Sequence, residues 1–100
     1  MAEIKVTSSE LRTKASELRQ LNGQFKKAVD DMTATEGQLM TMWDGESKEA
    51  FHSAYTSDVN QMTEFYNTIE KYCQALETNA EKYDAAEQKN LSTASTRSYK

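Results

Sequence analysis

The first half of the chain carries apolar side chains at a regular spacing. They recur at alternating steps of four and three residues between residues 11 and 43, with Asn22 and Glu36 as polar members of the series. This heptad pattern is typical of an α-helix that packs lengthwise against another helix. Thr7, followed by Glu10, fits a capping box at a helix start. The pattern predicts a helix over residues 8–41. Its packing positions are Leu11, Ala15, Leu18, Asn22, Phe25, Val29, Met32, Glu36, Leu39 and Trp43.

The same spacing resumes in the second half and predicts a helix over residues 46–87. Only residues 42–45 separate the two predicted helices, so these must run antiparallel as a hairpin. Gly45 suits the reversal of the chain, because glycine adopts backbone angles that other residues avoid. The packing positions of the second helix are Phe51, Tyr55, Asp58, Met62, Phe65, Ile69, Tyr72, Leu76, Asn79, Tyr83 and Ala86.

Each apolar stripe is wider than a single neighbouring helix requires. The residues that flank the packing positions are Leu21 and Ala28 in the first helix and Val59, Tyr66, Cys73 and Ala80 in the second. A stripe of this width is typical of a helix with two neighbours, as in a four-helix bundle. We therefore predict an all-α fold, an antiparallel helix-turn-helix hairpin that dimerises into a four-helix bundle. The residues expected to form its core and dimer face are Leu18, Leu21, Phe25, Val29, Met32, Met62, Phe65, Ile69 and Leu76.

The predicted hairpin is one domain, residues 1–87, and the heptad is lost in residues 88–100. That last segment is rich in Ser and Thr, and Leu91 is its only large aliphatic residue. Such a segment buries too little apolar surface to offset the entropy lost on ordering. We expect residues 88–100 to form a flexible C-terminal tail.

Charge and targeting signals narrow the function. Lys and Arg total 12 against 16 for Asp and Glu, without a basic cluster, so a nucleic-acid partner is not expected. The first residues, MAEIKVTSSELR, lack the apolar core of a signal peptide. Apolar runs also fall short of the roughly 20 residues that cross a bilayer. Composition alone therefore favours a soluble cytoplasmic protein.

Glu49 and His52 form the one pattern that resembles a catalytic motif, the E-x-x-H of di-iron helical bundles. Because Phe51 is a packing position, Glu49 should fall on the solvated face of its helix. His52 is the only histidine, and no serine or cysteine has a plausible base beside it. The single cysteine, Cys73, is expected to pack as a small apolar side chain. We predict no enzymatic activity, no metal site, no cofactor and no small-molecule substrate.

Two short motifs carry a resemblance to a known family. Trp43-Asp44-Gly45 reads W-x-G at the midpoint of the hairpin, and Tyr83-Asp84-Ala85-Ala86-Glu87 reads Y-x-x-x-E near the end of the second helix. Over residues 8–87 the chain resembles the WXG family, the early secretory antigenic target-like proteins that type VII secretion systems export. The position of both motifs in a chain of this length makes the match specific.

The resemblance implies a protein that folds and dimerises in the cytoplasm and is then secreted without a cleaved signal peptide. By the same resemblance, Trp43, Gly45, Tyr83 and Glu87 are the residues of a composite export signal. The implied partners are a second copy or a sister protein of the family, and a membrane-bound ATPase related to DNA translocases. Because one chain bears both motifs, we favour a homodimer. The alternative is a cytoplasmic coiled-coil adaptor without an export role. Against membrane activity, the helices lack a strongly basic face.

Overall fold

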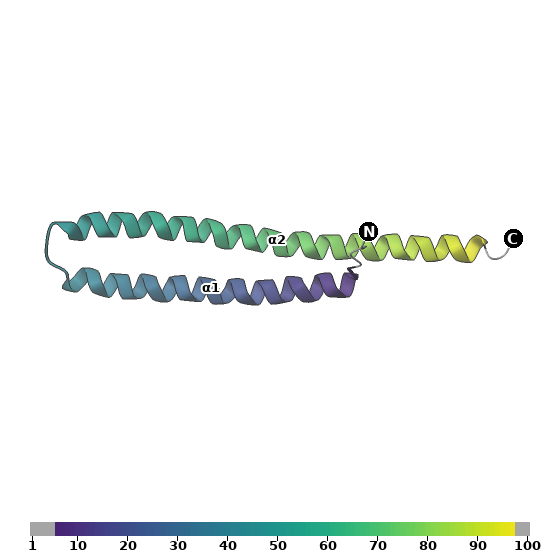
Figure 1. Cartoon of the computed structure of the whole chain (residues 1–100), viewed down its shortest axis with the longest axis horizontal. Coiled ribbons are helices and arrows are strands. Elements are labelled where there is room, and N and C mark those ends of the chain that lie inside the picture. The colour runs from purple at the N-terminus through teal and green to yellow at the C-terminus, as the bar shows by residue number, and fades with distance from the viewer. Residues whose placement is uncertain (1–5, 98–100) are drawn as a thin grey trace, which may run out of the picture. The chain divides into compact units, whose positions relative to one another are not determined.

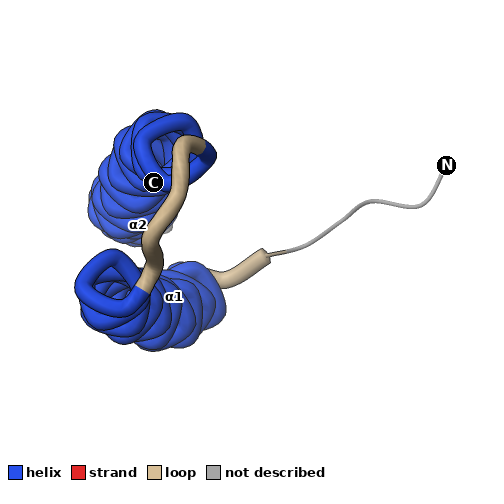
Figure 2. The backbone as a smooth tube through the Cα atoms, turned by 90° about the vertical axis from the view of Figure 1, so that its left-hand side faces the viewer, coloured by secondary structure: helices blue, strands red, loops and turns tan. Residues whose placement is uncertain are grey.

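The computed structural model describes residues 6–97. These form two α-helices, α1 (Ser8–Met42) and α2 (Ser47–Arg97), joined by a loop of residues 43–46 (Figure 1). Figure 2 looks onto this loop and shows the two helices side by side where it joins them. The predicted hairpin of two antiparallel helices is confirmed. Both ends of α1 and the start of α2 lie within one residue of the expected positions.

The start of α1 is capped by Thr7, as the sequence predicts. The Oγ1 of Thr7 accepts a hydrogen bond from the amide of Glu10 at 3.1 Å, and its carbonyl accepts one from the amide of Leu11 at 3.0 Å. The Thr7 hydroxyl also donates to the Glu10 carboxylate at 3.3 Å. The cap gives partners to backbone and side-chain groups at the helix end, where the helix itself supplies none.

The far end of α2 differs from the expectation. The helix continues past residue 87 to Arg97, so the part of the expected tail in residues 88–97 is helical. Proline is absent from the chain and no glycine lies beyond Gly45, so nothing in the sequence stops the helix once it has begun. Residues 1–5 and 98–100, at the two ends of the predicted hairpin and tail, lie outside the described residues.

The hairpin contains two compact units. Unit 1 combines Met1–Leu18 with Lys71–Lys100, and unit 2 is Arg19–Glu70. Each unit therefore holds a stretch of both helices, and each has its own packed interior.

Small side chains form the centre of unit 1. Ala15 on α1 and Cys73 and Ala80 on α2 are all fully buried. Side chains of this size let two helix backbones approach closely, so the contact is dense even though each residue contributes little area. Cys73 packs as a small apolar residue, as predicted.

The interior of unit 2 mixes apolar and polar side chains. Val29 is buried, and the rings of Phe25 and Phe65 meet edge to face with centroids 5.5 Å apart. The buried Asn22 donates to the backbone carbonyl of Tyr66 at 3.0 Å and to the carboxylate of Glu70 at 3.1 Å. The two polar interruptions of the first heptad, Asn22 and Glu36, are thus true interior positions, and both are buried with hydrogen-bond partners on α2.

The seam assigned to the second helix needs a correction. Cys73 and Ala80, expected only to flank the seam, are its most buried members, whereas Phe65 and Tyr72 are more than half exposed. Large apolar side chains of the wide stripe are thus left uncovered by α1. The exposed large apolar residues on that uncovered part of α2 are Phe51, Phe65, Tyr72 and Tyr83.

Within residues 6–97, neither helix has a stretch long and apolar enough to cross a membrane.

Candidate functional site

The turn motif lies in unit 2, where the chain leaves α1. Trp43 still donates its amide to the carbonyl of Leu39 at 3.0 Å, and the carbonyl of Gly45 accepts from the amide of Lys48 at 3.3 Å. Gly45 has a φ of +138°, an angle that side chains with a Cβ rarely adopt. A glycine at this position is therefore required by the backbone reversal that the sequence predicts.

The indole of Trp43 closes the end of the hairpin. Its ring lies 5.1 Å from the ring of Phe51 at the start of α2, and Phe51 in turn stacks against Tyr55 at 6.5 Å. Trp43 is half-buried, so part of its ring remains open to a partner. This confirms the predicted position of Trp43 at the end of the packed seam.

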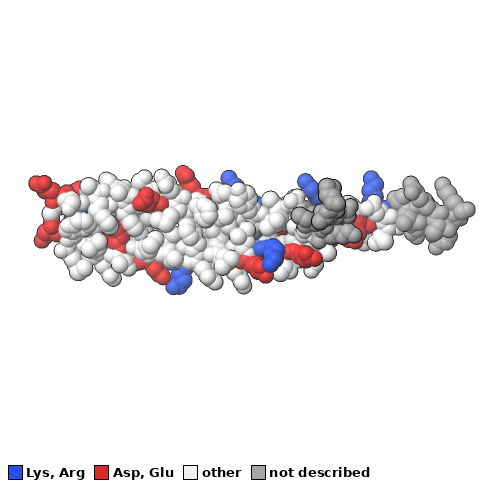
Figure 3. All heavy atoms as spheres, viewed as in Figure 1, with Lys and Arg blue, Asp and Glu red and all other residues white. Residues whose placement is uncertain are grey.

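Acidic residues surround the turn. Asp44, Glu46 and Glu49 are exposed, and red side chains gather around the loop at the left of Figure 3. Glu49 lies in the first turn of α2, where a negative charge is favourable beside the positive end of the helix dipole. Glu49 therefore stabilises a helix end, on the solvated face on which the sequence places it.

The tail motif lies in unit 1. The side chain of Tyr83 is 49% exposed, and Glu87 is exposed one helical turn further along α2. Residues four apart share one face of a helix, so the ring and the carboxylate can be contacted together. Tyr83 is therefore an accessible aromatic residue, although the sequence also counts it as a packing position.

Asp84, which lies between Tyr83 and Glu87 in the sequence, contacts the start of α1. One of its carboxylate oxygens lies 2.6 Å from the guanidinium of Arg12. A hydrogen bond from Ser8, the first residue of α1, and the bond from Arg12 hold the pKa of the Asp84 carboxyl below its ordinary value. This contact joins residues 72 positions apart, and no pattern in the sequence predicts it.

The structure thus groups the predicted signal residues in pairs. Trp43 and Gly45 form the turn of unit 2, and Tyr83 and Glu87 share a face of α2 in unit 1.

An apolar surface on unit 2 fits the predicted dimer face. Leu21 is 60% exposed and Phe65 is 54% exposed, and Met32 and Phe51 are also open to solvent. Beside them lies a shallow groove of about 380 Å³, lined by Asp31, Met32, Thr35, Glu36, Leu39, Phe51 and Tyr55. Large apolar side chains left in water on one side of a small domain mark an interaction surface.

The remaining residues predicted for the core and dimer face are more covered. Val29 is buried, and the half-buried ones are Leu18, Phe25, Met62, Ile69 and Leu76. The predicted set therefore divides into residues shielded between α1 and α2 and residues that a single chain leaves exposed.

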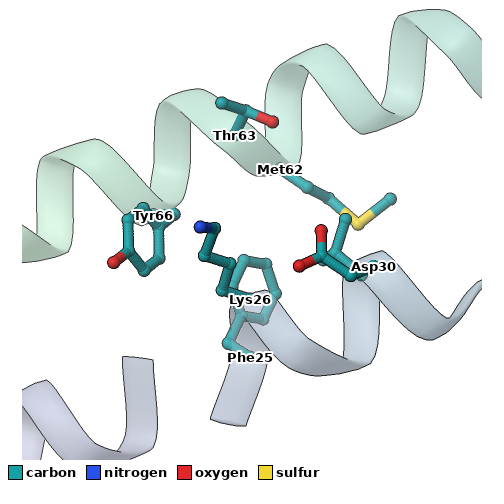
Figure 4. Close-up of a pocket in the computed structure, with 7 residues that line it drawn as sticks. Phe25, Lys26, Asp30, Met62, Thr63 and Tyr66 are labelled. Carbon is teal, nitrogen blue, oxygen red and sulfur yellow. The ribbon is translucent and has the colours of Figure 1, made fainter. Parts of the chain in front are cut away.

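A second groove between the helices of unit 2 has a polar rim. Lys26 and Tyr66 each follow the Phe25–Phe65 pair by one residue and so lie on a different side of the helices. The Lys26 ammonium lies 5.8 Å from the centre of the Tyr66 ring, and Figure 4 shows it reaching toward that ring beside Asp30. The hollow here is about 50 Å³. That is well below the roughly 300 Å³ at which small-molecule pockets begin.

The only histidine serves a structural contact. His52 Nδ1 lies 2.6 Å from a carboxylate oxygen of Glu36, which is the buried polar residue of α1. Across residues 6–97 no group of three or more His, Cys, Asp and Glu side chains is placed to hold a metal ion. His52 therefore supplies a partner for a buried carboxylate.

The sequence of this chain is similar to those of known proteins. The family model WXG100, described as proteins of 100 residues with WXG, matches residues 3–88. Type VII secretion system extracellular protein A of Staphylococcus aureus is 25% identical over 81 residues, which cover 81% of this chain and 84% of that protein.

Two crystal structures share the fold. The secreted protein EsxB of Bacillus anthracis has a TM-score of 0.76 at 22% identity, covering 87% of this chain and 99% of that chain. EsxA of Geobacillus thermodenitrificans has a TM-score of 0.76 at 20% identity, covering 89% of this chain and 96% of that chain.

Proposed function

The chain belongs to the WXG100 family, and from this premise we propose that it is secreted by a type VII secretion system. It acts by protein–protein binding as a dimer of helical hairpins. Trp43 and Gly45 at the turn, with Tyr83 and Glu87 on α2, form a composite export signal. Its relatives in Staphylococcus aureus carry the name of extracellular proteins of that system, which supports this assignment.

The exposure of Tyr83 is the observation that carries the proposal. A tyrosine that only packed in the hairpin would be covered by α1, yet about half of this side chain is open. Glu87 on the same face adds a negative charge, so the pair offers an aromatic ring and a carboxylate to one receptor. Aromatic residues of this kind dominate the energetics of protein recognition.

The dimer rests on the exposed apolar surface of unit 2. Leu21, Met32 and Phe65 lie in water when the hairpin is alone, and a partner hairpin would remove them from it. The partner is a second copy or a sister protein of the family. We favour the second copy because this chain contains both motifs.

In an antiparallel dimer, the turn of one copy would lie beside the tail motif of the other. The receptor would then read Trp43 and Gly45 from one chain together with Tyr83 and Glu87 from its partner. A membrane-bound secretion ATPase related to DNA translocases is the proposed receptor. An unpaired chain would not present the complete signal, so recognition would select assembled dimers.

The test is export in a bacterium that carries the secretion system. Tyr83→Ala and Glu87→Ala should abolish secretion while the folded dimer accumulates inside the cell, because both side chains are largely exposed. Glu81→Ala is the matched control, since it removes an exposed carboxylate of α2 outside the motif. Export of both motif variants at the wild-type level would refute the signal and favour the cytoplasmic adaptor.

A further inference from the structure

Asp84 occupies the centre of the tail motif, but its side chain is directed differently from those of Tyr83 and Glu87. Its carboxylate meets Arg12 at 2.6 Å and Ser8 in the first turn of α1. Tyr83, one residue earlier, is about half exposed. The motif therefore offers Tyr83 and Glu87 to a partner, while Asp84, whose side chain is itself 44% exposed, contacts the other helix.

Buried side chains precede Asp84 on the same face of α2, so its contact with α1 continues an existing helix–helix interface. Ala80 lies one turn before Asp84 on the same face of α2 and is fully buried, as is Ala15 on α1. One turn beyond Ala80, the ion pair between Asp84 and Arg12 connects the two helices. Asp84 thus anchors the first turns of α1 to α2 within the motif.

We propose that Asp84 is a positioning residue for the export signal. By fastening Ser8 and Arg12 to α2, it keeps the start of α1 beside Tyr83 and Glu87 and makes their presentation depend on a closed hairpin. This inference rests on the proposed function, because it assigns a role within that signal.

The electrostatics of the site agree with this role. Asp84 and the Glu10 carboxylate at the cap both lie where they can neutralise the positive N-terminal end of α1. An ion pair exposed to solvent contributes little to global stability. Removing it should therefore loosen the first turn of α1 without unfolding the protein, which separates a positioning role from a structural one.

The experiment compares variants in the full chain. Asp84→Asn keeps the size of the side chain and removes its charge, and Arg12→Gln removes the charge on the other side. Asp84→Glu retains the charge and serves as the conservative rescue. Glu17→Gln is the matched control, because it breaks an exposed ion pair, to Lys14 at 3.1 Å, that lies within α1 in the same unit.

Export at equal expression, dimer content by sedimentation, melting temperature and amide exchange in the first turns of α1 are measured for each. Asp84→Asn and Arg12→Gln should lower export about fivefold, the change in a local equilibrium that losing one surface ion pair at the upper end of its range produces. Amide exchange at residues 8–12 should rise, with dimer content and melting temperature unchanged. Asp84→Glu should restore export, and Glu17→Gln should leave it at the wild-type level.

The outcomes separate the two proposals. Wild-type export of both Asp84→Asn and Arg12→Gln, with Tyr83→Ala still blocked, overturns the positioning role alone. A loss of export that follows a loss of dimer or a lower melting temperature also overturns it, because the contact is then structural. If Tyr83→Ala and Glu87→Ala are themselves exported, the signal fails and the role of Asp84 fails with it.

Discussion

Replacing Phe65 by alanine tests whether a second hairpin covers the exposed apolar surface of unit 2. Phe65 is 54% exposed in the single chain, and its shielded part packs against Phe25. A fully buried phenylalanine loses about 3–5 kcal/mol of stability when cut to alanine. With little under half of the side chain covered, the isolated hairpin should lose only about 1.5–2 kcal/mol. In a dimer that covers the rest, the loss should approach the full value in each chain.

Urea denaturation followed by circular dichroism, at two protein concentrations a hundredfold apart, distinguishes the cases. If folding and dimerisation are coupled, the unfolding midpoint of the wild type rises with concentration. Phe65→Ala should lower that midpoint and also reduce the fraction of dimer in sedimentation. Val29→Ala is the control: its side chain is already buried within the hairpin, so its loss of about 2 kcal/mol should be the same with or without a partner. A midpoint independent of concentration, with a Phe65→Ala loss below about 2 kcal/mol, would refute the dimer face.

Three further predictions test the turn, the interior and the acid response. Gly45→Ala should lower stability by about 1–2 kcal/mol because of the positive φ, whereas Gly37→Ala, in open space within α1, should raise it by up to about 1 kcal/mol in thermal melts. Asn22→Ala should cost about 1–3 kcal/mol in urea denaturation, since the backbone carbonyl of Tyr66 and the Glu70 carboxylate each lose a buried donor. The lowered pKa of Asp84 means that its contribution is present above the unfolded pKa of about 3.9 and is lost as pH falls through the folded value. Because this contribution is confined to the start of α1, protection of the amides of residues 8–12, corrected for the intrinsic exchange rate, should fall in acid in the wild type but not in Asp84→Asn; the same acid response in both would contradict this.

Local rules in the sequence account for the hairpin itself. The heptad spacing, the Thr7 cap and the single turn glycine each act over a few residues, so the pattern that predicts them is also their physical cause. The predicted end of α2 at residue 87 was wrong, and the reason is also local. Residues 88–97 bury little apolar surface but continue the helix, because no residue that breaks a helix lies beyond Gly45.

Contacts between distant residues could not be predicted in the same way. A wide stripe indicates two neighbours, but it does not state which side each neighbour takes. The burial of Ala15, Cys73 and Ala80 shows which side is taken in unit 1, and their small size matters only once the two backbones meet. The Arg12–Asp84 pair likewise depends on the register of the hairpin, and neither charge stands out in a sequence with 28% charged residues.

The position of the one tryptophan and the one cysteine gives this protein two natural reporters of its own motions. Trp43 stands in unit 2 against Phe51, so its fluorescence responds to separation of the rings at the turn. Cys73 has no exposed surface in unit 1, so a thiol reagent can modify it only during a transient opening of that unit. Labelling rates and fluorescence kinetics recorded on the unaltered chain therefore time the two units separately. If the hairpin opens cooperatively, the labelling rate of Cys73 and the rate of the Trp43 fluorescence change should agree. If the two units open independently, the two rates should differ.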